Sequence, residues 1–179
     1  MGRDSRRPHR LPRPYTRTLS GMEILAVRYD HPDAVKLDEL VQQEYVRRYG
    51  DGDLTQLDAE MFAPPNGTYL MAYEDGQPLA TGGWRVQEDA VEGYRVGDAE
   101  IKRMFVLPQA RGRGLARRIL AALEADAHAA GRIRMVLETG TEQPEAIALY
   151  GSSGYRTVEK FGYYRTYEES ICMAKPLTG

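Results

Sequence analysis

The stretch Val106-Leu-Pro-Gln-Ala-Arg-Gly-Arg-Gly-Leu-Ala116 decides the fold, because the character of the chain changes within it. An apolar strand pattern ends at Val106, and Pro108 prevents its continuation. A loop with two glycines follows. From Leu115 the apolar residues recur at helical spacing until Gly131 ends the pattern. This order of strand, glycine-rich loop and helix predicts an anion site, because a helix N-terminus presents unpaired N–H groups and partial positive charge.

The residues of the loop suit a phosphate group. Gly112 and Gly114 lack a Cβ, so a ligand can approach the backbone closely. Arg111 and Arg113 add positive charge and forked donors. The loop is not a nucleotide P-loop, since G-x-x-x-x-G-K-[ST] is absent, and it is not G-x-G-x-x-G, since position 117 is Arg. The residues alone therefore indicate a phosphate site without naming its ligand.

A longer comparison suggests which ligand. The segment Gln109-Ala-Arg-Gly-Arg-Gly114 resembles the Q/R-x-x-G-x-G/A signature of the GNAT superfamily, the acyl-CoA-dependent N-acetyltransferases. Residues 100–106 resemble the strand that precedes this signature in the family. Ala146-Ile-Ala-Leu-Tyr150 with Gly154-Tyr155 resembles the family's second motif. The resemblance extends over residues 68–177, and more weakly over the helical segment before them.

The resemblance implies an α/β (α+β) fold, with a mixed, mostly antiparallel sheet and helices on both faces of a single GNAT-like domain. We expect this domain at residues 21–179. Residues 1–20 contain six Arg and one Asp among prolines, and predict a basic, Pro/Arg-rich disordered tail without regular structure.

Local patterns divide the domain into elements. We expect strands at 22–29, 100–106, 133–138, 155–158 and 170–175, helices at 33–49, 53–62 and 115–130, a hairpin of 68–73 with 78–86, and a short helix from Pro144. Strand 100–106, helix 115–130 and strand 133–138 make a βαβ unit, whose ligand is expected at the carboxyl ends of the strands. Regular alternation along 100–106 puts Glu100, Lys102, Met104 and Val106 on one face and Ile101, Arg103 and Phe105 on the other.

Composition narrows the class of protein. The 179 residues are 42% hydrophobic and 28% charged with a net charge of −2, which is ordinary for a soluble globular protein. Cys172 is the single cysteine and the three histidines are far apart, so no metal site is expected. We expect a cytoplasmic protein with neither a membrane nor a nucleic acid as partner.

The resemblance implies that acetyl-CoA is the co-substrate. By that resemblance the cofactor-binding residues are Phe105, Val106, Arg111, Gly112, Arg113, Gly114, Leu115, Ala116 and Gln143. The loop and the start of the helix would hold the pyrophosphate, and main-chain groups near Phe105 and Val106 would pair with the pantetheine arm. Gln143 stands where the family often has Asn, with the same amide on a longer arm.

Two residues are candidates for proton transfer. Tyr150 resembles the tyrosine that acts as general acid toward the cofactor sulfur in many members. Glu100 matches a strand position that carries a catalytic glutamate in some relatives, and partial burial would raise its pKa. The alternatives are a Tyr150 that only ends an apolar stripe, and a Glu100 that only forms salt bridges while ordered water serves as the base.

The expected function is transfer of an acetyl group from acetyl-CoA to a primary amine, by direct attack in a ternary complex. A small-molecule acceptor is favoured over a protein N-terminus, and a homodimer is usual in the superfamily. Arg85, Lys102 and Arg103 would suit an acceptor with a carboxylate, whereas the acidic loop 88–98 and the tyrosines of 161–167 would suit a cationic or aromatic amine. Two alternatives are a CoA-binding regulatory module and a nucleic-acid-associated protein acting through the Arg-rich tail.

Overall fold

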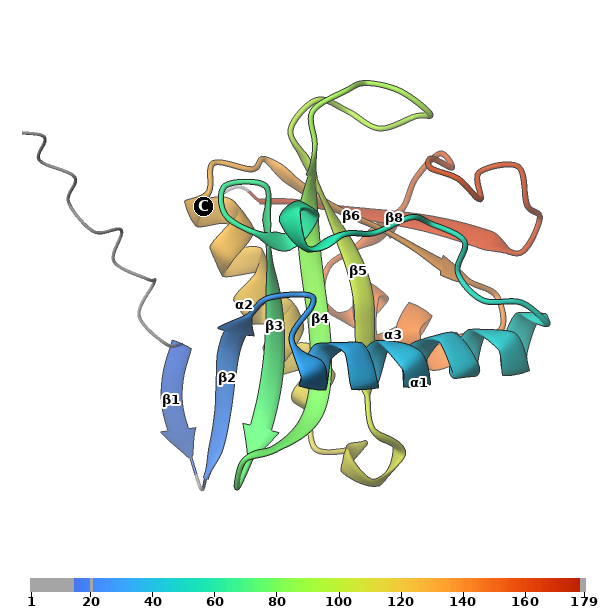
Figure 1. Ribbon diagram of the computed structural model, residues 1–179. Helices are drawn as coiled ribbons and strands as arrows, with labels where there is room; N and C mark the ends of the chain where they lie inside the picture. Colours follow the sequence, from blue (N-terminus) through green and yellow to red (C-terminus); the bar gives the residue numbers. More distant parts are fainter. Residues whose placement is uncertain (1–14, 20, 178–179) are drawn as a thin grey trace, which may run out of the picture.

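The computed structural model describes residues 15–19 and 21–177, which form an eight-stranded sheet flanked by three helices (Figure 1). The strands are β1 (Tyr15–Leu19), β2 (Met22–Val27), β3 (Gly67–Glu74), β4 (Gln77–Gln87), β5 (Asp98–Val106), β6 (Arg134–Gly140), β7 (Arg156–Thr157) and β8 (Ser170–Pro176). The helices are α1 (Pro32–Tyr49), α2 (Leu115–Ala129) and α3 (Pro144–Ser152), with short 3-10 turns η1 (Ala59–Phe62) and η2 (Pro108–Ala110). None of the helices in the described residues is long and apolar enough to cross a bilayer.

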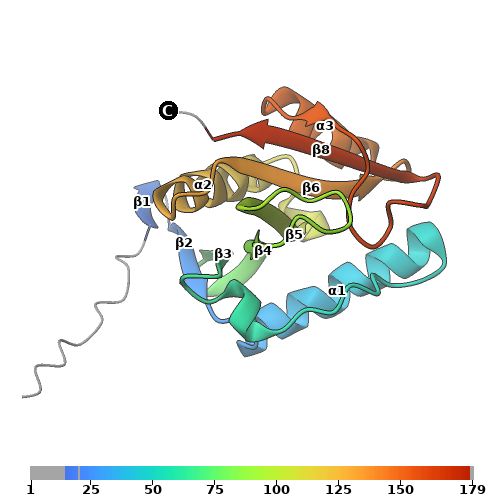
Figure 2. The ribbon, with the colours of Figure 1, turned by 90° about the horizontal axis from the view of Figure 1, so that it is seen from above.

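The sheet has the order β1-β2-β3-β4-β5-β6-β8-β7, and β5–β6 is its parallel pair among antiparallel neighbours. Helix α1 covers one face, and α2 and α3 cover the other (Figure 2). Ile119 and Leu123 of α2 are fully buried in the larger core with Trp84, whose indole N–H donates to Asp126 over 2.7 Å. Leu37 of α1 is buried with Phe62 and other residues in a second core on the opposite face. The predicted fold class is confirmed.

Several local predictions are also confirmed. Gly50 ends α1 in the left-handed conformation, and Pro144 opens α3. Asp75 and Gly76 both have positive φ, as a tight hairpin turn between β3 and β4 requires. Strands β5 and β6 are parallel on either side of α2, so the βαβ unit is present.

Two predictions about elements are wrong in part. Residues 15–19 form strand β1 against β2, although no regular element was expected there. Pro14 is the last proline of the tail. The five residues after it are not proline, so each has a backbone N–H that can donate in a sheet, and they include residues that favour strands. The remainder of the predicted tail, residues 1–14 and residue 20, lies outside the described residues. The helix expected over 53–62 is limited to η1, which begins after Asp58 caps its N-terminus.

The predicted alternation along β5 fails after Lys102 because the strand contains a β-bulge. Gly83 pairs with Lys102 and Thr81 with Phe105, so two residues of β5 lie opposite Gly82 alone. Arg103, the first of the two, has a φ of +59°. Met104 consequently packs in the α2 core together with Ile101, and Arg103 turns toward α1. The bulge thus places two cationic side chains in succession on the α1 face.

Strands β5 and β6 separate soon after they begin to pair. Their register covers Asp98–Glu100 against Arg134–Val136, and the following residues of the two strands have no ladder between them. The divergence is visible in Figure 1, where β6 leans away from β5 while α1 passes in front. This opening lies at the carboxyl ends of two parallel strands, where α/β folds bind ligands.

Candidate functional site

A cleft of about 390 Å³ lies at the opening between β5 and β6. Its walls come from the second half of α1, the bulged part of β5, the glycine loop with the start of α2, the end of β6, and α3. The predicted site residues that line it are Phe105, Val106, Arg111, Gly112, Gly114, Leu115, Ala116, Gln143 and Tyr150. The structure therefore brings most of the predicted residues to one cavity.

The glycine loop has the geometry that an anion needs. Gly112 and Gly114 have φ values of +76° and +74°, and a Cβ added at either would meet no atom within 4 Å. The space over the loop is therefore open to a ligand. Gly114 is the N-cap of α2 and has no side chain to accept from the first turn. A phosphate oxygen can take that place.

The arginines around the loop have different surroundings. The guanidinium of Arg111 lies 5.9 Å from the centre of the Phe105 ring, and its Nε donates to the Val106 carbonyl over 3.1 Å. Arg117 lines the cleft and donates to the hydroxyls of two serines at the end of α3. Arg113 does not line the cleft, because its guanidinium pairs with Glu74. Arg111 and Arg117 are thus better placed than Arg113 to meet a phosphate.

The far wall of the cleft is tied to α1. Gln143 caps α3 and donates from its side-chain amide to the hydroxyl of Tyr49 over 3.1 Å. Thr139 of β6 also lines the cleft, and its hydroxyl is buried with no hydrogen-bond partner in the described part of the chain. A buried hydroxyl without a partner is costly, so Thr139 is a further candidate to bind a ligand in the cleft.

Tyr150 projects from α3 into the cleft and is 5% exposed. Its ring packs edge-on against Tyr155 at 5.6 Å. Burial, and to a smaller extent Tyr45, raise the pKa of the Tyr150 phenol, so the group stays protonated at neutral pH. Tyr45 lines the same cleft from α1, and its burial raises its pKa to about 12. Tyr150 therefore keeps the proton that a general acid needs.

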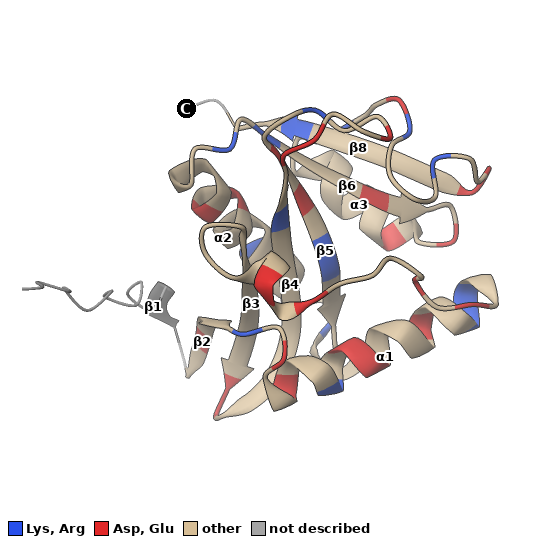
Figure 3. Cartoon of the chain, turned by 45° about the horizontal axis from the view of Figure 1, so that its top comes forward, with Lys and Arg blue, Asp and Glu red and all other residues tan. Residues whose placement is uncertain are grey.

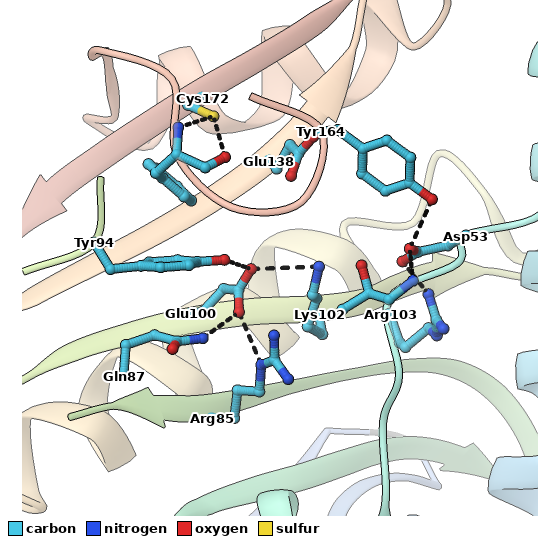
Figure 4. Close-up of polar contacts among 12 residues, drawn as sticks. Asp53, Arg85, Gln87, Tyr94, Glu100, Lys102, Arg103, Glu138, Tyr164 and Cys172 are labelled. Atoms are coloured by element: carbon cyan, nitrogen blue, oxygen red, sulfur yellow. Dashed lines mark hydrogen bonds and ion pairs between the residues drawn. The ribbon is translucent and has the colours of Figure 1, made fainter. Parts of the chain in front are cut away.

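Glu100 is not among the residues that line the cleft, and Figure 4 shows its contacts. Its carboxylate is fully buried and accepts hydrogen bonds from Arg85, Gln87 and Tyr94, each over 2.8 Å, with Lys102 Nζ at 3.3 Å. Burial alone would raise the pKa of Glu100, but Lys102 and Arg85 outweigh it and lower the pKa. The expected rise in this pKa is therefore wrong, and Glu100 fits the alternative of a carboxylate that forms salt bridges.

Glu138, which the sequence analysis did not single out, lines the cleft from β6. The hydroxyl of Ser170 donates to its Oε1 over 2.8 Å. Burial is the largest influence on the carboxyl group and raises its pKa to about 7. Its position in the sequence could have identified Glu138 as a site residue. It lies near the carboxyl end of the second parallel strand of the βαβ unit, where a ligand was expected.

The cleft, the bulged and diverging strands, and the glycine loop agree with what comparison of the chain finds. Residues 34–155 match the model of the acetyltransferase (GNAT) family. The chain belongs to the GNAT family. A relative from Azospirillum brasilense, named IAA acetyltransferase, is 39% identical over 121 residues, which are 68% of this chain and 75% of the relative.

Solved structures described as acyltransferases agree with this chain in fold. One is a Klebsiella pneumoniae subsp. pneumoniae protein described as an acyl-CoA N-acyltransferase. It superposes on this chain with a TM-score of 0.70 and 30% sequence identity, over 88% of this chain and 98% of that one. A Salmonella typhimurium protein described as an acetyltransferase was solved with its cofactor acetyl-CoA. It has a TM-score of 0.67 and 19% identity, over 89% of this chain and 96% of that one. As a member of the GNAT family, this chain is an acyl-CoA-dependent acetyltransferase.

Proposed function

We propose that this GNAT enzyme acetylates the primary amine of a small molecule by direct attack of the amine within a ternary complex. The observation that carries the proposal is that Glu138 and Tyr150 line one cleft with the glycine loop. One group has a pKa suited to accepting a proton near neutrality, and the other holds its proton. The relative named IAA acetyltransferase supports a small acceptor.

The protons of the reaction can be assigned to this pair. Acetyl-CoA supplies an activated acyl group, and a new C–N bond replaces its C–S bond. An ammonium that becomes an amide loses two protons in total. In the proposal Glu138 accepts one of these protons and passes it to solvent. Tyr150 donates its own proton to the departing thiolate, and the second proton from the amine then reprotonates Tyr150. Glu138 replaces Glu100 as the proposed base because it lines the cleft and is free of an ion pair among the described residues.

The cofactor residues keep their proposed roles. Gly112, Gly114 and the first turn of α2 hold the pyrophosphate, with Arg111 and Arg117 supplying charge. The main chain at Phe105 and Val106, beyond the bulge, meets the pantetheine arm on the side of β5 that β6 leaves open. Gln143 and Thr139 contact the same arm from the opposite wall.

A cysteine intermediate is not part of the proposal. Cys172 is buried in β8, does not line the cleft, and accepts a hydrogen bond from the Phe161 N–H. Burial raises the pKa of its thiol, which disfavours the reactive thiolate. Direct attack therefore accounts for transfer without a second covalent step.

The experiment is detection of acetylated product and free CoA thiol with a panel of amines, amino acids, polyamines, aminoglycosides and peptides. We expect acetylated product from at least one small amine, and none from enzyme in which Gly112→Asp blocks the phosphate loop. Acetylation of peptide N-termini alone would contradict the small-molecule proposal. Absence of product from every compound, with acetyl-CoA bound, would contradict amine acetylation.

The cytoplasmic setting and the homodimer also remain proposals. Light scattering coupled to size exclusion tests the second, with a dimer mass expected at micromolar concentration and a monomer mass contradicting it.

A further inference from the structure

The charged side chains of the cleft fall into two groups. Arg48, Lys102 and Arg103 line the part near α1 and β5, and each lies within ion-pair distance of a carboxylate. Arg111 and Arg117 line the part near the glycine loop, and neither forms an ion pair within the described residues. Cations that are free to receive an anion are therefore found at the proposed phosphate end of the cleft.

The paired cations are held closely. Arg103 is 4% exposed in its side chain and bridges Asp38 at 2.6 Å and Asp53 at 2.5 Å. Tyr164 completes this corner, because its hydroxyl accepts from the Leu54 N–H over 2.6 Å and donates to Asp53 over 3.3 Å. The guanidinium of Arg103 is thus committed to the protein.

The other two cations are similarly committed. Lys102 Nζ lies 3.3 Å from Glu100, whose remaining contacts include Arg85 at 2.8 Å. Arg48 pairs with Glu44 at 2.6 Å and Glu145 at 2.5 Å, and donates to the main chain of residue 142 over 2.6 Å. Arg85, Lys102 and Arg103 were the residues that would suit an acceptor carboxylate, and each already faces a carboxylate of the protein.

The local charges make the same point. Next to the diverging strands, the three cations Arg85, Lys102 and Arg103 are matched by the three carboxylates of Asp38, Asp53 and Glu100. Figure 3 shows acidic and basic residues following one another along β5. Glu138 is additional to this balanced set, and Figure 4 shows it across from Lys102, beside Tyr164. It is the one cleft-lining carboxylate without an ion pair among residues 15–19 and 21–177.

We propose that the acceptor is a cationic amine without a carboxylate next to the amino group, rather than an α-amino acid. Its ammonium balances Glu138, whereas an acceptor carboxylate would enter a site with no uncompensated cation. A charge left uncompensated in a buried site is strongly unfavourable. This inference rests on the proposed amine acetylation and names the class of substrate for that site.

The test uses pairs of compounds that differ only by the carboxylate: tryptamine and tryptophan, tyramine and tyrosine, agmatine and arginine, cadaverine and lysine. Release of CoA thiol gives kcat/KM for each compound at one pH. In every pair that reacts, we expect the amine without the carboxylate to have a kcat/KM higher by at least about tenfold. An amino acid that reacts as well as its partner would overturn the inference and leave amine acetylation standing. If none of the eight compounds reacts while acetyl-CoA binds, both proposals fail for amines of these types.

A variant tests the electrostatic cause. Asp53→Asn removes one of the two carboxylates that hold Arg103, and so frees part of its guanidinium for a ligand. We expect the preference for the carboxylate-free amine to fall several-fold, chiefly because the amino acid reacts better. Acetyl-CoA affinity and a thermal melt are measured alongside, since a folded variant is needed for the comparison. An unchanged preference in a folded variant would contradict the assigned cause.

Discussion

Glu100 and Glu138 lie on neighbouring parallel strands, and their carboxyl groups have pKa values shifted in opposite directions. Glu100 is fully buried and Glu138 is partly buried, and burial raises a carboxyl pKa. At Glu100 the effect of burial is offset by the cations Arg85 and Lys102 at contact distance. Glu138 instead accepts a hydrogen bond from the hydroxyl of Ser170. The difference separates a structural carboxylate from one that can exchange a proton near neutral pH.

The first prediction concerns the rate of Glu138→Gln. Loss of the proposed base should lower kcat/KM for the amine by about a hundredfold at pH 8. Glu138 must be ionised to accept a proton, so its advantage should disappear as the pH falls below about 7. The ratio of wild type to variant across pH isolates this effect, because ionisation of the amine affects both enzymes equally. A ratio that does not change between about pH 5.5 and 8.5, which is roughly one and a half units on either side of the expected pKa, would contradict the assignment.

The second prediction concerns stability. The carboxyl of Glu138 has a raised pKa when folded, so folding is penalised above about 7 and not below 4.5, where it is protonated in both states. Glu138→Gln should therefore stabilise the protein at pH 8, by on the order of 1 to 3 kcal/mol, and this gain should vanish toward pH 4.5. Thermal melts at both pH values measure the difference.

Glu100→Gln is the matched control for this comparison. It leaves Arg85 and Lys102 without their shared carboxylate in a buried position. We expect a loss of roughly 3 to 5 kcal/mol at neutral pH. A Glu100→Gln protein as stable as the wild type would show that the buried carboxylate has no structural role.

The third prediction concerns Tyr150. Tyr150→Phe keeps the ring that packs on Tyr155 and removes the proton intended for the thiolate. We expect kcat to fall by about 10² and the affinity for acetyl-CoA to remain nearly unchanged. Tyr163→Phe is the control, because Tyr163 is half exposed and does not line the cleft. Equal rates for the two variants would exclude Tyr150 as the acid.

The fourth prediction concerns the phosphate loop. Gly112→Asp places a carboxylate in the open space over the loop, where it would repel a pyrophosphate. Gly112→Asn has nearly the same shape and tolerance of positive φ but no charge. We expect acetyl-CoA affinity to fall much more in the Asp variant, with the difference reduced at high salt. Calorimetric titration measures both variants, and equal affinities would mean that the phosphate binds elsewhere.

Much of the fold was predictable because its signals are local. The Asp75-Gly76 turn, the helix ends at Gly50 and Pro144, and the loop from Pro108 to Gly114 each depend on the conformational limits of a few residues. The proposed cofactor residues came from the resemblance to the GNAT signature, and the structure brings most of them to one cleft.

The part of the cleft near α1, β5 and β6 depends on contacts between distant segments. The bulge at Arg103 and Met104 lies opposite Gly82 of β4, and no period-two pattern reveals it. Besides Lys102 of its own strand, the partners of Glu100 come from β4 and the loop before β5, and the hydrogen-bond partner of Glu138 comes from β8. A pKa depends on these neighbours, so the sequence alone favoured the wrong direction for Glu100 and did not single out Glu138.

The central claim is amine-dependent acetyl transfer within a ternary complex, and initial-rate kinetics test it most directly. Release of CoA thiol is measured while acetyl-CoA and a reactive amine from the panel are varied together. The account predicts negligible release without amine and intersecting lines in the double-reciprocal plot, as required when both substrates bind before reaction. Parallel lines with an isolable acetyl-enzyme, or release that is independent of amine, would contradict it.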